Sequence, residues 1–302
     1  MTIDRLLEGL KARDPRAIGR AISLVENGDE NADLILSSLD EDLVSGATIL
    51  GITGPPGAGK STLTNGIISR LRQNSERIGI IAIDPSSPIS GGAILGDRIR
   101  MMQHATDRDV VVRSMATRGR LGGLCATAGA AVRIMASCGC STIIIETVGV
   151  GQSEMDIIRL ADITLLVLAP GLGDDIQAMK AGLLEVADIL VVNKADCKGA
   201  DILAMDLEAV ARKGSSTPTQ VSMTVATEGK GITELLDRIA RLDSEHRDSG
   251  ERNKRRRGAH DQEVLEWCLE ILRPKLLAEI TRRNLPLAGD PRLKAKKILE
   301  EQ

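Results

Sequence analysis

The chain of 302 residues contains no phenylalanine and no tyrosine, and Trp267 is its single tryptophan. Aromatic side chains usually dominate core energetics, so a core that relies on packed rings is excluded. Aliphatic residues can fill a core when volume and pattern are kept, and 42% of the chain is hydrophobic. We therefore expect a core of aliphatic side chains.

A strong net charge and a long apolar run are also missing. The formal net charge is -3, so the field of the whole chain does not favour nucleic acid or an anionic membrane surface. No apolar run approaches the roughly 20 residues of a membrane-spanning helix. The N-terminus lacks the apolar core of a secretory signal, and Asp4, Glu8 and Asp14 are atypical of a transit peptide. We expect no nucleic-acid or membrane partner and a cytoplasmic location.

Metal-ligating residues are scarce. Five cysteines, an odd number, do not indicate a disulfide framework. Cys138 and Cys140 could form half of a metal site, but the histidines, at 104, 246 and 260, are not at ligand spacing from them. Of two interpretations, a metal-carrying pair and two small buried hydrophobes entering a strand, we favour the second.

Short apolar runs alternate with longer segments in the middle of the chain. The runs are nearly continuous and rich in β-branched residues, as expected for strands buried on both faces of a parallel sheet. The segments between them are long enough for crossover helices. The pattern predicts a doubly wound, mostly parallel α/β sheet. The five runs are 47–53, 78–84, 141–147, 163–169 and 189–196.

A glycine-rich motif follows the first run. Residues 54–61 fit G-x-x-x-x-G-K-[ST] between a predicted strand and a predicted helix, which makes the expected fold a P-loop NTPase. The glycines let backbone N–H groups point at phosphate oxygens. We expect Lys60 to contact the β- and γ-phosphates and the Ser61 hydroxyl to ligate Mg²⁺. The predicted phosphate-binding residues are Gly54, Pro56, Gly57, Ala58, Gly59, Lys60, Ser61 and Thr62.

A second motif, residues 193–196, follows the last apolar run. The Asp196 carboxylate can accept hydrogen bonds from both N1–H and the exocyclic amine of guanine, a pair that adenine does not offer. The Lys194 stem can lie over the base, and the Asn193 amide can bond the base and hold neighbouring loops. Val225 and Ala226 are placed to contact the base through backbone N–H groups. We predict GTP rather than ATP as the nucleotide.

Carboxylates at strand ends supply candidate magnesium ligands. Residues 146–149, Glu-Thr-Val-Gly, resemble the D-x-x-G switch, so Glu146 would hold the ion or its water and the Gly149 N–H would contact the γ-phosphate. With Lys60, these two are the predicted catalytic residues. Asp84 and Asp97 are further candidate ligands, with a helix cap or loop role as the alternative for each.

One expected residue is missing after the switch glycine. Ras-like enzymes use a glutamine there to orient the attacking water. This chain has Val150 at that position, and Gln152 stands two residues further on. We therefore predict slow hydrolysis of GTP that a partner accelerates.

Helical patterns flank the central region. We expect an N-terminal helical extension over 1–45, a P-loop GTPase domain over 46–243 and a C-terminal helical region over 244–302. The C-terminal region begins with a polar, basic stretch that we interpret as a linker or an exposed helix start. A helical pattern that Pro274 interrupts follows, and then a last helix at about 291–301. We interpret Arg255–Arg257 as a solvated face rather than a site for an acidic partner.

Four longer segments resemble the MeaB/ArgK group of GTPases, which includes the human methylmalonic aciduria type A protein. They are IDPSSPISGGAILGDRIRM (83–101), RSMATRGRLGGL (113–124), ETVGVGQSE (146–154) and APGLGDDIQAMKAGLLEVADILVVNKAD (169–196). The resemblance covers about residues 5–285. The group usually has histidine where Arg120 stands and serine where Val225 stands.

This resemblance implies a GTPase chaperone for an adenosylcobalamin-dependent acyl-CoA mutase, above all methylmalonyl-CoA mutase. Such a chaperone gates cofactor loading and protects the mutase, and it pairs as a homodimer through its C-terminal helices. The resemblance also implies that the loop 170–181 is a third switch, whose polar members here are Asp174, Asp175, Gln177 and Lys180.

Three other functions remain open at this point. An amino-acid-transport-linked kinase or ATPase would need ATP, which residues 193–196 disfavour. A nickel metallochaperone of the hydrogenase- or urease-maturation type usually carries histidine-rich or cysteine-plus-histidine motifs, which this chain lacks. A scaffold with an inactive site is disfavoured by the intact Lys60 and Ser61.

Overall fold

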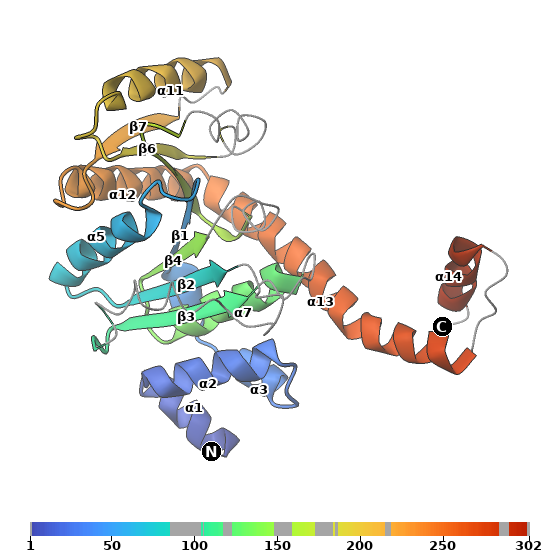
Figure 1. Cartoon of the computed structure of the whole chain (residues 1–302). Coiled ribbons are helices and arrows are strands. Elements are labelled where there is room, and N and C mark those ends of the chain that lie inside the picture. Colours follow the sequence, from blue (N-terminus) through green and yellow to red (C-terminus); the bar gives the residue numbers. More distant parts are fainter. Residues whose placement is uncertain are drawn as a thin grey trace.

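The computed structural model describes residues 2–84, 104, 106–116, 123–147, 159–172, 184, 187–214, 219–283 and 290–300. Within these ranges one parallel sheet has helices on both faces, and a long C-terminal helix projects away from it (Figure 1). The predicted doubly wound α/β fold is therefore confirmed.

Seven parallel strands make up the sheet, in the order β3-β2-β4-β1-β5-β6-β7. All five apolar runs are strands. Two further strands, β3 and β7, lie at the two edges and carry polar residues such as Arg113 and Gln220, which hid them from a search for apolar runs. The strands are β1 (Thr48–Thr53), β2 (Ile78–Asp84), β3 (Val110–Ala116), β4 (Thr142–Thr147), β5 (Ile163–Leu168), β6 (Ile189–Asn193) and β7 (Gln220–Thr224).

The strand order makes β1 the turning point of the sheet. β1 lies between β4 and β5; β2 and β3 lie on one side, where the chain returns to place β4 next to β1, and β5, β6 and β7 follow outward on the other side. Because all strands are parallel, their carboxyl ends share one edge of the sheet. Ligands of open α/β sheets bind outside that edge at the point where the order reverses.

Side chains alternate along each strand, so both faces of the sheet carry apolar residues, and helices cover each face. On one face, α5 (Lys60–Gln73) and α12 (Ile232–Asp248) pack over residues such as Ile52 and Leu165. On the other face, α7 (Gly123–Ser137) covers Ile143 and Ile145, and α11 (Ala200–Gly214) packs against β6 and β7. The buried core in the described residues is aliphatic, with methionine and cysteine, as the missing aromatics predict.

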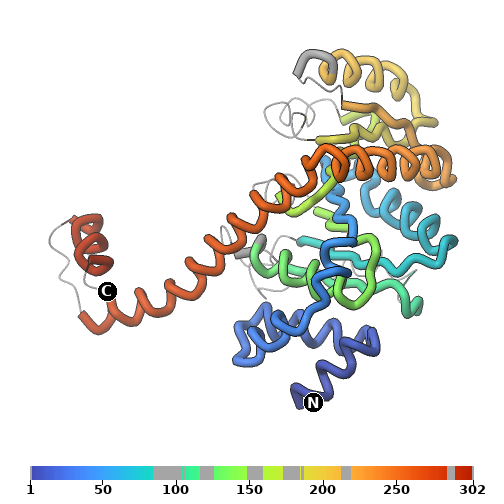
Figure 2. Tube along the Cα trace, turned by 180° about the vertical axis from the view of Figure 1, so that it is seen from behind, coloured from blue at the N-terminus to red at the C-terminus, as the bar shows by residue number. Residues whose placement is uncertain are grey.

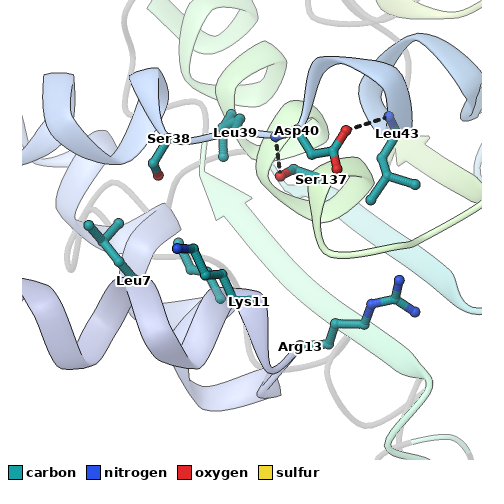
Figure 3. A pocket seen from close by; sticks show the side chains of 9 residues that line it. Leu7, Lys11, Arg13, Ser38, Leu39, Asp40, Leu43 and Ser137 are labelled. Atoms are coloured by element: carbon teal, nitrogen blue, oxygen red, sulfur yellow. Dashed lines mark hydrogen bonds between the residues drawn. The ribbon is translucent and has the colours of Figure 1, made fainter.

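Four short helices precede the sheet and pack mainly on α7 through Ile18, Ile22 and Val25. Between them and the end of α7 lies a cavity of about 370 Å³ (Figure 3), which is lined by four leucines and by Lys11, Arg13, Ser38, Asp40 and Ser137. The helices are α1 (Ile3–Lys11), α2 (Pro15–Glu26), α3 (Ala32–Ser37) and α4 (Glu41–Gly46).

The two cysteines weighed as a metal pair lie in this core. Cys138 and Cys140 are 2% and 1% exposed, which supports their interpretation as buried hydrophobes. Burial raises the pKa of the Cys138 thiol to about 11 and that of Cys140 to about 12, so neither thiol ionises readily to a metal-binding thiolate. Among the described residues, no cluster of three or more histidines, cysteines and acids could hold a metal.

The C-terminal region differs from the sequence interpretation in two ways. The polar stretch is no linker, because it forms the end of α12 and the start of α13 (Glu251–Arg283), and the boundary expected at 243/244 lies inside α12. Pro274 does not interrupt the helix, since the turns on both sides of it stay helical. α13 projects from the sheet, and α14 (Pro291–Glu300) lies beside its far end (Figures 1 and 2).

In the basic run of α13, Arg257 is exposed as expected, but Arg255 and Arg256 are not part of a solvated face. Arg256 bonds both carboxylate oxygens of Asp162 at 2.7 Å, and Arg255 bonds both of Asp188 at 2.8 Å. The buried Arg252 pairs with Asp243 at 3.0 Å. Asp162 and Asp188 directly precede β5 and β6, so this arginine clamp fixes α13 to the amino edge of the sheet.

None of the helices in the described ranges has the length and apolar character needed to cross a membrane.

Candidate nucleotide-binding site

The phosphate loop leaves the carboxyl end of β1 and enters α5, as its sequence predicts. Gly54 has φ +142°, and a Cβ there would lie 2.1 Å from the Val167 carbonyl oxygen. Gly59 has φ +89°, and a Cβ there would lie 2.3 Å from Asn193 Nδ2. Both positions therefore require glycine for conformation and for space.

Lys60 is the first residue of α5, and only 7% of it is exposed. Its ammonium donates to the carbonyl oxygens of Gly54, at 2.6 Å, and Pro55, at 3.0 Å. The cation thus lies over the loop, beside the N-terminus of a helix whose dipole also favours an anion. A phosphate could replace the two carbonyls as its partner without a change in the helix.

Ser61 and Glu146 meet beside Lys60. The Ser61 hydroxyl donates to Glu146 Oε1 at 2.6 Å, although the two residues come from α5 and β4. Glu146 is 1% exposed and lies opposite Ile52 of β1 in the sheet register.

This hydroxyl and carboxylate are hard oxygen donors, which suit Mg²⁺. Since the described residues offer no further cluster of acids here, phosphate oxygens and water would supply the other ligands. The donor set therefore fits magnesium bound together with a nucleotide.

Asn193 connects the phosphate loop to the end of β7. Its side-chain NH₂ donates to Ala58 O at 3.0 Å, and its Oδ1 accepts from Thr224 Oγ1 at 3.1 Å and from Ala226 N at 3.2 Å. Asn193 is 2% exposed. One buried amide thus holds three loops at the carboxyl edge in a fixed arrangement.

The remaining base-binding candidates lie at the same edge. Lys194 adopts φ +56°, and both it and Asp196 follow the end of β6. The Val225 N–H donates to Lys230 O at 3.0 Å, which shapes the turn that carries Ala226. A cavity of about 570 Å³ extends from Ser61 and Thr62 to Ala226. Asn65 and Ser69 of α5 also line it, whereas Lys194 and Asp196 do not.

Several predicted residues are not placed with their side chains. Asp97 and Gly149 lie outside the described residues, as do Val150, Gln152, Arg120 and the four polar residues of the expected third switch, Asp174, Asp175, Gln177 and Lys180. Asp84 is described only in its backbone, at the end of β2.

Sequence reasoning missed three threonines at this edge. Thr224 supports Asn193, and Thr147 donates to Thr53 at 3.2 Å beside the phosphate loop. The only signal in the sequence was that each ends an apolar run or a strand, where a buried hydroxyl needs a partner.

Comparison with known proteins gives a consistent result. A family model described as "Methylmalonyl Co-A mutase-associated GTPase MeaB" matches residues 18–282. A chain of Pyrococcus horikoshii named as a GTPase is 47% identical over 285 residues, which cover 92% of this chain and 90% of that one. The methylmalonic aciduria type A homolog of Mus musculus is 33% identical over 290 residues, with 88% and 69% covered.

A solved structure shows the same fold. The crystal structure of an LAO/AO transport system kinase superposes with a TM-score of 0.69 at 22% identity, and the match covers 99% of this chain and 98% of that one. At this identity the likeness concerns the fold alone.

Proposed function

This chain belongs to the family of methylmalonyl-CoA mutase-associated GTPases called MeaB, and on that premise we propose that it is a GTP-hydrolysing chaperone of such a mutase. GTP hydrolysis would gate adenosylcobalamin loading and protect an adenosylcobalamin-dependent acyl-CoA mutase. The observation that carries the proposal is the convergence of Lys60, the Ser61–Glu146 pair and Asn193 at the carboxyl edge of the sheet.

Each of these residues has a defined task in phosphoryl transfer. Lys60 would exchange its two carbonyl partners for β- and γ-phosphate oxygens and so stabilise charge in the transition state. Ser61 and Glu146 would hold Mg²⁺, which neutralises charge on the phosphates when bound. Gly149, which follows Glu146 by three residues, would donate its N–H to the γ-phosphate.

Guanine selection would depend on the loops that Asn193 holds. Asp196 would accept two hydrogen bonds from the guanine edge, and Lys194 would lie over the ring. Because Asn193 bonds both the phosphate loop and Ala226 N, phosphate and base would be bound at a fixed separation. GTP and GDP are therefore the nucleotides we propose.

We also infer that hydrolysis is slow in the isolated protein. Val150 replaces the glutamine that positions water in Ras-like enzymes, and Gln152 is displaced by two residues. The mutase would supply or order the missing group. The location we propose is cytoplasmic.

A homodimer is part of the proposal, with the C-terminal helices as its interface. Large apolar side chains of α13 and α14 are exposed, most of them beyond the part of α13 that packs on α7, and a second copy would cover them. These are Val264, Leu265, Leu269, Ile271, Leu272, Leu277, Ile280, Leu293 and Leu299, between 41% and 66% exposed. Leu269→Lys with Leu277→Lys should convert a dimer to a monomer in light scattering, whereas Ile202→Lys, on exposed α11, should not.

The other candidate functions have less support. A metallochaperone needs accessible ligands, whereas Cys138 and Cys140 are buried and have raised pKa values. A transport-linked kinase or ATPase needs ATP, and Asp196 disfavours it. Nickel titration tests the first alternative and GTP-against-ATP competition tests the second.

The deciding experiment measures phosphate release from GTP with and without an adenosylcobalamin-dependent methylmalonyl-CoA mutase. We expect a rise of tenfold or more, or about 1.4 kcal/mol of barrier. Lys60→Ala, mixed with the same mutase, shows whether the phosphate comes from this chain. An unchanged rate would leave the GTPase assignment intact and contradict the coupling to this mutase.

A further inference from the structure

Two buried threonines face each other where β1 and β4 leave the sheet. The Thr147 hydroxyl donates to Thr53 Oγ1 at 3.2 Å, and the two residues are 2% and 1% exposed. The backbone register of β1 with β4 ends one step earlier, at Ile52 and Glu146. The hydroxyl bridge therefore extends the pairing of these strands by one residue, to the point where both loops begin.

Each threonine is joined directly to a residue of the phosphate site. Thr53 precedes Gly54, whose carbonyl oxygen accepts from Lys60 at 2.6 Å. Thr147 follows Glu146, which accepts from Ser61 at 2.6 Å. A change in the separation of the two threonines would therefore move the support of Lys60 relative to the acid beside Ser61.

The bridge lies on the face of the sheet away from α5. Strand side chains alternate, and Ile52 packs on the α5 side, whereas Ile145 packs on the α7 side. Thr53, next to Ile52, and Thr147, two residues after Ile145, therefore both point to the α7 side. Their hydroxyls cannot touch a nucleotide bound at α5, so any effect on hydrolysis must act through the backbone.

From this geometry we propose that Thr53 and Thr147 are a positioning pair for GTP hydrolysis. The bridge sets the distance between the phosphate loop and the end of β4, and thus between Lys60 and Glu146. This inference rests on the proposed hydrolysis of GTP at this edge.

Hydroxyl groups are a costly choice for a buried position, which supports a specific role. Valine has nearly the shape of threonine and would pack here without desolvating a polar group. A hydrogen bond differs from an apolar contact because it fixes distance and direction. The bridge thus fixes the distance between the ends of β1 and β4, where apolar packing alone would tolerate small shifts.

The test compares isosteric variants in single-turnover GTP hydrolysis and in GTP binding, measured with a fluorescent analogue. Thr147→Val removes the donor, and we expect a hydrolysis rate about tenfold lower, or about 1.4 kcal/mol, with affinity changed by less than about twofold. Thr147→Ser keeps the donor and should restore the rate. Thr53→Val with Thr147→Val should be no worse than either change alone, because both remove one bridge.

A matched control is present on a neighbouring strand. Thr164 of β5 is 2% exposed, and its hydroxyl has no hydrogen-bond partner among the described residues. Thr164→Val makes the same chemical change without breaking a bond and should leave hydrolysis unchanged. Thr53→Val decides the question from the other strand if Thr147→Val does not fold.

Three results would overturn the inference: an unchanged rate in Thr147→Val, no recovery in Thr147→Ser, or equal losses of rate and affinity. In each case wild-type hydrolysis would show that the proposed GTP hydrolysis stands. A wild-type protein that does not hydrolyse GTP would overturn both, because the bridge would then have no reaction to support.

Discussion

The two edges of the sheet use buried polar groups in opposite ways. At the amino edge, Asp162 and Asp188 are fully engaged by arginines of α13. At the carboxyl edge, the Lys60 ammonium donates to the carbonyl oxygens of Gly54 and Pro55, and Ser61 bonds a carboxylate suited to a metal. The first edge is closed by charge pairs, whereas the second holds groups that an anion and a cation could take over.

This difference shows why charge in a sequence does not identify a binding site. Both edges bury a lysine or an arginine together with acids, before β5 and β6 at one edge and at the ends of β1 and β4 at the other. What distinguishes them is the kind of contact: arginine–carboxylate pairs join α13 to the amino edge, whereas Lys60 bonds backbone carbonyl oxygens at a helix N-terminus. The arginine clamp is complete within the protein and fixes α13, while the phosphate loop presents a cation at a helix N-terminus, where a ligand anion fits.

The largest expected effect concerns the carboxyl edge. Asp196→Ala should reduce the preference for GTP over ATP from about 10⁴-fold or more to less than about tenfold, because the pair of acceptors for guanine is lost. Competition of both nucleotides against a fluorescent GDP analogue measures the ratio. Asp196 is exposed, so thermal stability should hardly change. A retained preference would show that guanine is not selected by this carboxylate.

The next effect concerns the amino edge. Asp162→Asn should lower the free energy of unfolding by about 3–5 kcal/mol, because Arg252 and Arg256 lose a buried counter-charge. Urea unfolding measures it, with the exposed Asp237→Asn as control. GTP affinity of the folded variant should stay unchanged. A loss under about 1 kcal/mol would mean that the clamp contributes no more than a surface pair.

A smaller effect on the free energy of unfolding distinguishes a buried hydroxyl that has a hydrogen-bond partner, at Thr147, from one that has none in the described structure, at Thr164. Thr164→Val should raise the free energy of unfolding by about 1–2 kcal/mol, since a buried hydroxyl without a partner in the described structure is replaced by methyl. Thr147→Val should lower it by a similar amount, because its bond to Thr53 is lost. Equal signs in the two urea titrations would refute this distinction.

The smallest effect lies on the projecting helix, outside both edges. Arg282 and Arg283 donate to the Glu279 carboxylate and lower its pKa from 4.5 to about 2. Since the folded pKa lies below the ordinary value, the pair stabilises above about pH 4.5 and is lost as pH falls through about 2. A carboxyl titration by NMR should show this midpoint, and Arg282→Gln with Arg283→Gln should raise it.

Most of the sheet could be predicted from sequence because its inner strands are buried on both faces. Their apolar runs are therefore nearly continuous, as in β5, where every residue is buried. The edge strands could not be found in this way, since β7 has only two buried residues, Ser222 and Thr224, and both are polar. Periodicity reports burial, and an edge strand is only partly buried.

At the site, sequence motifs predicted the residues that belong to short contiguous patterns. The phosphate loop, Glu146 and Asn193 all lie at the predicted edge. Pairings between distant segments could not be predicted, because neither partner carries a local signal. The clamp between Arg256 and Asp162 spans 94 residues, and the bridge between Thr147 and Thr53 also spans 94.

The central claim is that the carboxyl edge hydrolyses GTP. Its most direct test is Mg²⁺-dependent phosphate release from GTP and from ATP by the wild-type protein and by Lys60→Ala. We expect release from GTP at less than about 1 s⁻¹, little from ATP, and a loss of about 100-fold or more in the variant. Equal release from both nucleotides, or an unaffected Lys60→Ala protein, would contradict the account.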